Sequence, residues 1–481
     1  MRRLLLIFLL GFSSLFAATP PNILLIMTDQ QSADALSCRM GDRYISTPAL
    51  DGLAAKGTYF TRAYAANPIC MPSRNAIFTG RYPHETGVTE NTQERLDPKL
   101  FPNLGTYFRQ AGYDTAYFGK WHLCYDEKAP ETHGFRVTDT DTQDVNTADN
   151  AVRFLRQSHG QPFVLVASFL NPHNVCELAR GERLSNGPIG DPPGPDLLPP
   201  PPANGGAPRD EPDSMTLIRK GYHANPQFPV GQFTPERWQA LRWGYYRLIE
   251  KADREIGRLL AALREAGLEK NTVIIFTSDH GECAGAHGLN QKTVFYEESA
   301  RVPLIIFAPG HRRAATAAGL VNTGIDLLPT MLDYAGLKRP AELSGRSLRS
   351  LTQGDEAGWR DEVVVGNNMR QTGLVGGFIP MTEGRMLRTP RYKYCVYTYG
   401  ELRESLIDLE RDPGEMNDLA RDPGHRSVLL EHRERLRAHG LATKDALVAT
   451  LLADDVKPRA FPAVTTPRNP RRAGESPKQA N

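Results

Sequence analysis

Cysteine is scarce in this chain of 481 residues, which contains only six. No two of them are separated by two residues, so the paired-cysteine motifs of zinc ribbons and of thiol–disulfide redox proteins are absent. Six cysteines in so long a chain do not define a disulfide framework either. The role of any one cysteine must therefore be judged from its neighbours in the sequence.

An excess of charge of one sign is also lacking, since the formal net charge is +2. Arg2 and Arg3 lie in an N-terminal segment that we expect to be removed, and their loss leaves 55 basic residues against 55 acidic ones. A chain without net charge gives no electrostatic reason to bind nucleic acid or an anionic membrane surface. We expect neither partner, and any preference for anions must come from a local site.

Long apolar runs are missing beyond the N-terminus, where none reaches the roughly 18 residues that a membrane span needs. We therefore expect no integral membrane span. Residues 1–18 are typical of a signal peptide, with two arginines, an apolar run at 4–10 and small residues before a cleavage near Ala17 or Ala18. An uncleaved anchor or a buried strand is the alternative. A cleaved signal predicts a periplasmic or secreted protein.

Apolar runs alternate with amphipathic stretches along the rest of the chain. Runs typical of buried strands lie at 22–28, 115–118, 163–170, 272–278 and 302–308. Helices are expected at 47–57, 235–266 and 326–335. Strands that alternate with helices predict an α/β fold with a mostly parallel central sheet.

Changes in amino-acid composition and in the predicted secondary structure divide the chain into parts. After the signal peptide we expect a large domain at 19–345, a smaller α+β subdomain at 346–445 and a partly disordered tail at 446–481. A stretch rich in proline and glycine at 187–212 is expected to form a surface loop of the large domain.

Polar side chains follow four of the predicted strands. They are Asp29 and Gln30, Lys120 and His122, His173, and Asp279 and His280. Because sites in open α/β sheets form beyond the carboxyl ends of the strands, we expect these side chains to lie together. Two carboxylates, an amide oxygen and an imidazole suit a divalent cation that tolerates oxygen ligands. Helix capping by the two aspartates is the alternative.

The most specific motif is residues 70–80, CMPSRNAIFTG. It resembles the maturation motif of the sulfatase family, in which the cysteine of Cys-x-Pro-Ser-Arg is oxidised to formylglycine, an aldehyde that hydrates to a geminal diol. Further blocks match the family in order, namely NILLIMTDQQ, GRYPHETGV, GYDTAYFGKWHL, FLNPHN, TSDHGE, VPLIIFAPG, RYKY and LIDLERDPGEMNDLA. The resemblance covers most of residues 22–420. It implies an alkaline-phosphatase-like α/β sandwich with a small C-terminal subdomain.

The resemblance also implies catalytic roles. Hydrated formylglycine at Cys70 is the nucleophile, whose second hydroxyl drives the release of sulfate. Arg74 lies one helical turn from Cys70, so both can face one site, and Lys120 binds the modified residue. His173 is the proton donor to the leaving alcohol and Lys292 lies beside the sulfate. The family match makes His122 a base in the second step.

The same resemblance implies a metal site. Asp29, Gln30, Asp279 and His280 match the family's ligands for one divalent ion, which is usually Ca²⁺. Many family members have a second acid where Gln30 stands and an asparagine where His280 stands. The ligand set of this chain therefore carries less negative charge, and its imidazole leaves Mg²⁺ or Mn²⁺ open.

The function implied is hydrolysis of a sulfate ester, with a sulfated carbohydrate as the favoured substrate. A formylglycine-generating enzyme or an anaerobic sulfatase-maturating enzyme is the partner that modification of Cys70 requires. Two other functions remain open. One is hydrolysis of a phosphate or phosphonate ester by the same residues, and the other is non-catalytic glycan binding with unmodified Cys70, against which the intact motif argues.

Overall fold

The computed structural model describes residues 20–91, 94–310, 315–370, 373–375 and 379–462. The predicted signal peptide at 1–18 lies outside the described residues, as does the end of the predicted tail, 463–481. All six cysteines are described, each as a free thiol. Over the described ranges, no helix combines the length and apolar character that crossing a membrane requires.

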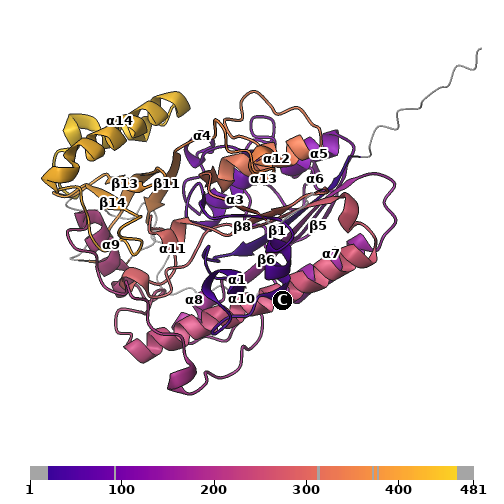
Figure 1. The fold of residues 1–481 in the computed structure, drawn as a ribbon, viewed down its shortest axis with the longest axis horizontal. Helices are drawn as coiled ribbons and strands as arrows, with labels where there is room; N and C mark the ends of the chain where they lie inside the picture. The colour runs from indigo at the N-terminus through magenta and orange to yellow at the C-terminus, as the bar shows by residue number, and fades with distance from the viewer. Residues whose placement is uncertain (1–19, 92–93, 311–314, 371–372, 376–378, 463–481) are drawn as a thin grey trace, which may run out of the picture.

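The centre of the molecule is an eight-stranded sheet of order β5-β4-β6-β1-β7-β8-β2-β9 (Figure 1). Its strands are β1 Asn22–Asp29, β2 Thr58–Phe60, β4 Asp114–Gly119, β5 Val137–Asp139, β6 Phe163–Pro172, β7 Thr272–Ser278, β8 Leu304–Phe307 and β9 Ala315–Ala317. The five strands from β5 to β7 run parallel, whereas β8 is antiparallel to both of its neighbours. The predicted α/β fold with a mostly parallel sheet is confirmed.

Helices cover both faces of this sheet (Figure 1). One face packs against α3 Cys70–Thr79, α5 Leu104–Gln110 and α12 Thr323–Tyr334, and the other against α2 Pro48–Ala54, α7 Asp144–Leu155 and α10 Pro235–Glu265. Strand β1 shows why its sequence is a continuous apolar run. Ile23, Leu25 and Met27 enter the first core while Leu24 and Ile26 enter the second, so every position is buried.

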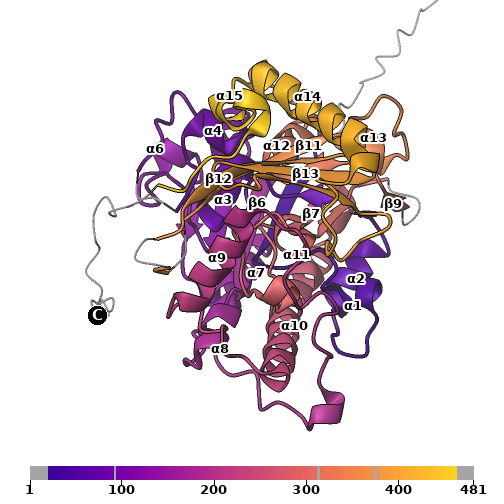
Figure 2. The ribbon, with the colours of Figure 1, turned by 90° about the vertical axis from the view of Figure 1, so that its left-hand side faces the viewer.

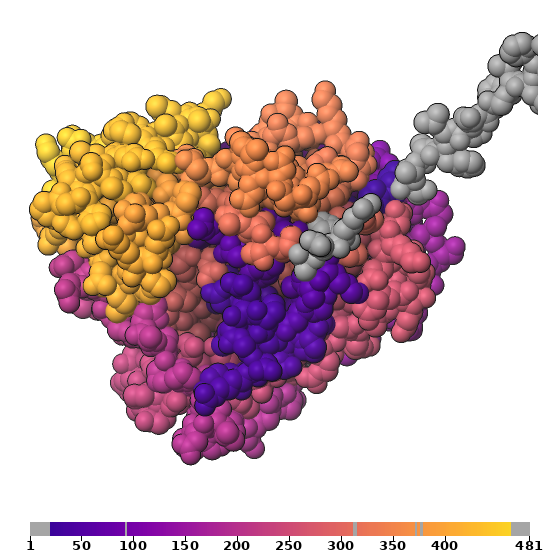
Figure 3. All heavy atoms as spheres, viewed as in Figure 1, coloured from indigo at the N-terminus to yellow at the C-terminus, as the bar shows by residue number. Residues whose placement is uncertain are grey.

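The C-terminal subdomain is built on a four-stranded antiparallel sheet, β11 Val363–Met369, β12 Thr382–Arg388, β13 Tyr392–Tyr397 and β14 Glu404–Asp408. Helices α14 Arg426–Thr443 and α15 Ala446–Leu451 pack on one face of it (Figure 2). In the space-filling view the yellow C-terminal part of this subdomain forms one end of the molecule (Figure 3). Helix α15 belongs to the stretch expected as a tail, but Val448 and Leu451 are buried against α14, so packing continues past residue 445.

The remaining elements are mostly short, apart from α9. They are α1 Ser37–Met40, α4 Pro83–Thr86, α6 Pro130–His133, α8 Val175–Arg180, α9 Asp213–Ala224, α11 Glu297–Ala300, α13 Arg349–Thr352, the strands β3 Ala63–Tyr64 and β10 Val321–Asn322, and the 3₁₀ turns η1 Pro195–Leu197, η2 Glu269–Asn271, η3 Ala286–Gly288, η4 Pro423–His425 and η5 Ala453–Val456. The proline-rich stretch 187–212 contains η1 as its helical turn, and Arg209 donates its backbone N–H to Met416 of the subdomain.

Candidate active site

The carboxyl ends of four neighbouring strands meet at one edge of the central sheet. Asp29 ends β1, Lys120 follows β4, His173 follows β6 and Asp279 follows β7. Helix α3 reaches this edge with its first residue, Cys70. Residues up to 250 positions apart in the sequence are therefore brought to one place.

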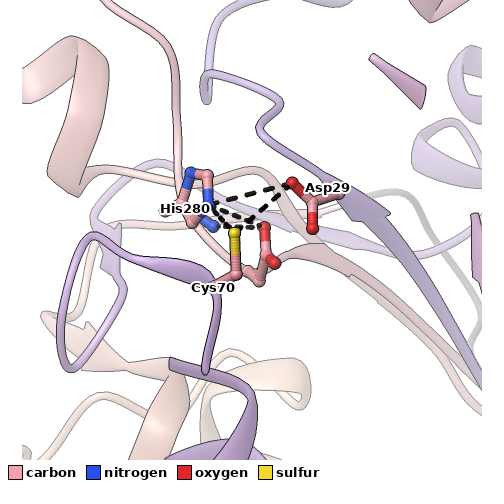
Figure 4. A group of neighbouring side chains, drawn as sticks. Asp29, Cys70 and His280 are labelled. Carbon is pink, nitrogen blue, oxygen red and sulfur yellow. Dashed lines mark hydrogen bonds and ion pairs between the residues drawn. The ribbon is translucent and has the colours of Figure 1, made fainter. Parts of the chain in front are cut away.

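The Cys70 thiol lies buried at the centre of this group. Its Sγ is 3.2 Å from His280 Nε2, 3.2 Å from Lys292 Nζ, 3.8 Å from Lys120 Nζ and 3.9 Å from Asp29 Oδ1. Figure 4 shows Cys70, His280 and Asp29 facing one another. Burial and the Asp29 carboxylate act to raise the pKa of the Cys70 thiol, but Lys120, Lys292 and His280 lower this pKa well below its ordinary value. The site therefore stabilises negative charge at position 70.

Arg74 bridges the two aspartates of the site. Its Nη2 lies 3.0 Å from Asp29 Oδ2 and its Nε 2.8 Å from Asp279 Oδ2, and all three side chains are fully buried. Its Nη1 donates to Ser168 Oγ at 2.7 Å and to the Lys120 backbone oxygen at 3.0 Å. Because the Arg74 guanidinium bonds to both carboxylates and is itself held by Ser168 and the Lys120 backbone, it fixes the orientation of Asp29 and Asp279.

Asp29, Cys70, Asp279 and His280 each offer one ligand atom, and these four atoms lie within 4.8 Å of one another. His280 Nδ1 donates to the Gly281 carbonyl at 3.0 Å, which leaves Nε2 with a lone pair toward the aspartates. Burial and the Asp29 carboxylate raise the pKa of Asp279 to about 6. Two carboxylates and one imidazole that converge in this way fit a divalent cation, which would relieve the repulsion between the acids.

Lys120 and other cations keep Asp29 ionised. Lys120 Nζ is 2.5 Å from Asp29 Oδ2. Burial acts to raise the pKa of Asp29, but Lys120, His173, Arg74 and Lys292 lower it well below its ordinary value. Asp29 is thus ionised at neutral pH through the positive charges of the protein itself.

Gln30 stands beside this set and contacts two further charged residues. Its Oε1 accepts from Lys292 Nζ at 2.6 Å, and its Nε2 donates to Glu282 Oε2 at 2.5 Å. Its backbone N–H donates to Asp279 Oδ1 at 3.1 Å. The sequence patterns did not single out Glu282, although its place in TSDHGE, three residues after Asp279, was a signal that could have found it.

His173 lies half-buried at the rim of the group. Burial lowers the pKa of its imidazole to about 4, and the charges of Lys120 and Lys292 act in the same direction. The end of β6, directly before His173, is anchored by Asp144, whose Oδ1 accepts from the Leu170 backbone N–H at 2.7 Å and whose Oδ2 accepts from Asn171 Nδ2 at 2.7 Å. His173 is therefore neutral near pH 7 and held on a fixed backbone.

His122 is the one predicted site residue that the described contacts do not join to the others. Its side chain is exposed. Its backbone oxygen accepts from Asn75 Nδ2 of α3 at 3.5 Å, but among the described residues no hydrogen bond or ion pair links its imidazole to Cys70 or to the metal-ligand set. This position leaves the imidazole on the solvent side of the site.

The arrangement suits a tetrahedral anion. Lys120 and Lys292 approach the side chain of residue 70, and Arg74 adds a third positive charge in the same buried environment, where opposite charges attract each other far more strongly than in water. The carboxylates and the imidazole add a place for a metal ion next to them. Together these groups can neutralise the negative charge that builds on the oxygens of an ester of sulfuric or phosphoric acid as it is cleaved.

Two family models match the chain. The model described as Sulfatase matches residues 21–337, and the model described as N-sulphoglucosamine sulphohydrolase, C-terminal, matches residues 285–441. The first spans the central sheet with all the site residues, and the second includes the antiparallel sheet of the subdomain.

Several known hydrolases are similar to this chain over most of its length. The Delta 4,5-hexuronate-2-O-sulfatase of Bacteroides thetaiotaomicron is 30% identical over an alignment of 450 residues, and the match covers 89% of this chain and 90% of that protein. A solved structure of a 2-O GAG sulfatase has a TM-score of 0.76 at 28% identity, covering 89% of this chain and 93% of that one. The phosphonate monoester hydrolase of Agrobacterium radiobacter has a TM-score of 0.69 at 26% identity, covering 88% and 95%. This chain belongs to the sulfatase family, sulfuric ester hydrolases of the alkaline-phosphatase-like fold.

Proposed function

We propose that this protein removes sulfate from a sulfated carbohydrate by hydrolysis of the sulfate ester. The observation that carries the proposal is the buried Cys70 side chain, which lies 3.2 Å from Lys292 Nζ and from His280 Nε2 within the family's motif. Two of the similar proteins support the substrate class, because one is named a hexuronate-2-O-sulfatase and the other a 2-O GAG sulfatase.

The active form proposed carries formylglycine in place of Cys70, made by a formylglycine-generating or anaerobic sulfatase-maturating enzyme. When present, this group supplies a hydroxyl oxygen as the nucleophile. Lys120 and Lys292 lie where they would bind the modified side chain and the sulfate oxygens, and Arg74 holds the surrounding carboxylates in place. We also propose that the protein works outside the cytoplasm, in the periplasm or secreted, as its first residues predict.

The proposed metal ligands are Asp29, Gln30, Asp279 and His280, with Ca²⁺ as the ion. The bound ion would supply positive charge to the sulfate oxygens. His173 would hold the proton for the leaving alcohol, since its pKa responds to charge nearby and an arriving sulfate anion raises it. Lys292 keeps its positive charge next to position 70, because Cys70 and Asp29 raise its pKa against the effect of burial.

Removal of the metal should abolish most of the activity. Purified protein should contain one divalent ion per chain by elemental analysis, chelation should remove the ion and the turnover together, and added Ca²⁺ should restore both. The reason is that Asp29 and Asp279 otherwise repel each other beside the anionic substrate. Parallel additions of Mg²⁺ and Mn²⁺ identify the preferred ion. Full turnover by a metal-free preparation would show that the ligand assignment is wrong.

The function is tested with a panel of defined sulfated saccharides and their desulfated counterparts, using protein verified as modified at Cys70. We expect sulfate release from one or more sugars, measured by ion chromatography. Similarity to a phosphonate monoester hydrolase makes phosphonate ester hydrolysis the second candidate. Side-by-side kcat/KM values for aryl sulfate, aryl phosphate and aryl phosphonate separate the two, and a faster phosphonate reaction would replace the proposed function.

A further inference from the structure

The side-chain amide of Gln30 is held between a cation and an anion. Lys292 Nζ donates to Gln30 Oε1 at 2.6 Å, and Gln30 Nε2 donates to Glu282 Oε2 at 2.5 Å. All three residues are buried, with at most 4% of their surface exposed. An ammonium group can only donate and a carboxylate can only accept, so these partners permit one orientation of the amide, with its oxygen toward Lys292.

Glu282 cannot turn away from this role, because its other oxygen is fixed as well. Glu282 Oε1 accepts from the backbone N–H of Ala284 at 2.9 Å and from that of Gln291 at 2.5 Å. The carboxylate therefore bonds to backbone donors at one end and to the Gln30 amide at the other. The Cys176 thiol, 3.4 Å from Gln30 Nε2, is a weak acceptor and offers the amide no comparable alternative.

We propose that Glu282 is a positioning residue that locks the Gln30 amide with its oxygen toward Lys292 and the metal site. This proposal rests on the proposed function and deepens it. Gln30 is neutral, whereas many family members have an acid at this position. In this chain the negative charge lies instead on Glu282, which contacts Gln30 from the side opposite Lys292. The contacts Glu282–Gln30–Lys292 then continue to Cys70, whose Sγ is 3.2 Å from Lys292 Nζ.

The variant Glu282→Gln tests the lock with almost no change of shape. One end of the new side chain is an NH₂ group, which cannot face the backbone N–H groups of Ala284 and Gln291 and must therefore face Gln30. Gln30 must then turn its oxygen toward residue 282 and present its own NH₂ to the Lys292 ammonium and to the metal. We expect Ca²⁺ affinity to fall by about 10–100-fold, as for other partners of metal ligands, and the unfolding temperature in EDTA to fall as well.

The double variant Gln30→Glu with Glu282→Gln should restore what the single variant loses. The carboxylate at position 30 would accept from the new NH₂ group and still present an oxygen to Lys292, while the oxygen of residue 282 would accept the two backbone N–H groups. The total charge equals that of the wild type. Gln30→Glu alone should be impaired, because it sets two carboxylates face to face.

Two measurements are made on all four proteins, namely calorimetric titration of the EDTA-treated protein with Ca²⁺ and thermal unfolding in EDTA. The matched control is Glu211→Gln, which removes another buried carboxylate, one that pairs with Arg219 away from the site. Glu211→Gln should lower the unfolding temperature and leave the Ca²⁺ affinity unchanged. Adding Gln30→Glu to this control should not restore its unfolding temperature.

Restoration in the double variant, by either measurement, supports the positioning role. The proposal is overturned if Glu282→Gln binds Ca²⁺ and unfolds like the wild type, or if the losses of the two single variants simply combine in the double variant. A wild type that takes up no Ca²⁺ would count against the proposed metal, and the unfolding temperatures in EDTA would still decide the orientation of the amide.

Discussion

Replacing Cys70 by alanine should lower kcat/KM on every sulfate ester by about a millionfold, as removal of a catalytic nucleophile does in other hydrolases. The reason is the convergence of positive charge on this one side chain, where Lys292 and Lys120 approach Sγ within 3.2 and 3.8 Å. No other side chain of the group can take its place, because the neighbours are the cations and the metal ligands themselves. Steady-state rates on 4-nitrophenyl sulfate and on a sugar sulfate measure the loss.

The control is Cys395→Ala, which removes a buried thiol from β13 of the C-terminal sheet and should leave turnover intact. Mass spectrometry of the wild-type peptide that contains Cys70 should show a side chain that has lost sulfur and two hydrogens and gained one oxygen. Full activity from protein in which only unmodified Cys70 is found would contradict the nucleophile assignment.

Replacing His173 by alanine should slow hydrolysis of a sugar sulfate by about 10²–10⁴-fold, the usual contribution of a general acid. The loss should depend on the leaving group. A sugar alkoxide is a strong base that needs a proton, whereas nitrophenolate is a weak base that leaves nearly unaided. His173→Ala should therefore slow hydrolysis of a nitrophenyl sulfate far less. The control is His425→Ala, which removes a half-buried imidazole from η4 of the C-terminal subdomain. Equal losses on both substrates would make His173 a sulfate-binding residue.

The pH dependence separates His173 from Lys292 as the proton donor. Burial, with Lys120 and Lys292, lowers the pKa of free His173 to about 4, so the protonated fraction falls as the pH rises above that value. Because kcat/KM reports the free enzyme, it should fall with rising pH on the sugar sulfate and stay level on the nitrophenyl sulfate. A level profile on both would assign the proton to Lys292, whose pKa Cys70 and Asp29 raise despite burial.

Local sequence was sufficient for the elements that carry the fold. The apolar run at 22–28 became β1, which is buried on both faces, and the run at 272–278 became β7. The helix expected at 235–266 is α10, Pro235–Glu265, which begins with Thr234 accepting from the Arg237 backbone N–H. Periodicity and capping act within a few residues, so they can be read without knowledge of the rest of the chain.

The direction of a strand is a different matter. The run at 302–308 gave β8 as a strand, but its apolar residues look the same whether it runs parallel or antiparallel to β7. Only the path of the chain between β7 and β8 settles its direction. Likewise α15 is ordered because the C-terminal sheet and α14 provide a surface that buries Val448 and Leu451.

The same division holds at the site. The motif that starts at Cys70 and the polar residues at the strand ends were enough to choose the family and the candidate residues. Which atoms meet was decided by tertiary structure, because a hydrogen bond depends on position to within a fraction of an ångström and on a partner hundreds of residues away. Arg74 bridging both aspartates, His122 facing solvent and Glu282 fixing the Gln30 amide are outcomes of that kind, set by packing that no local pattern encodes.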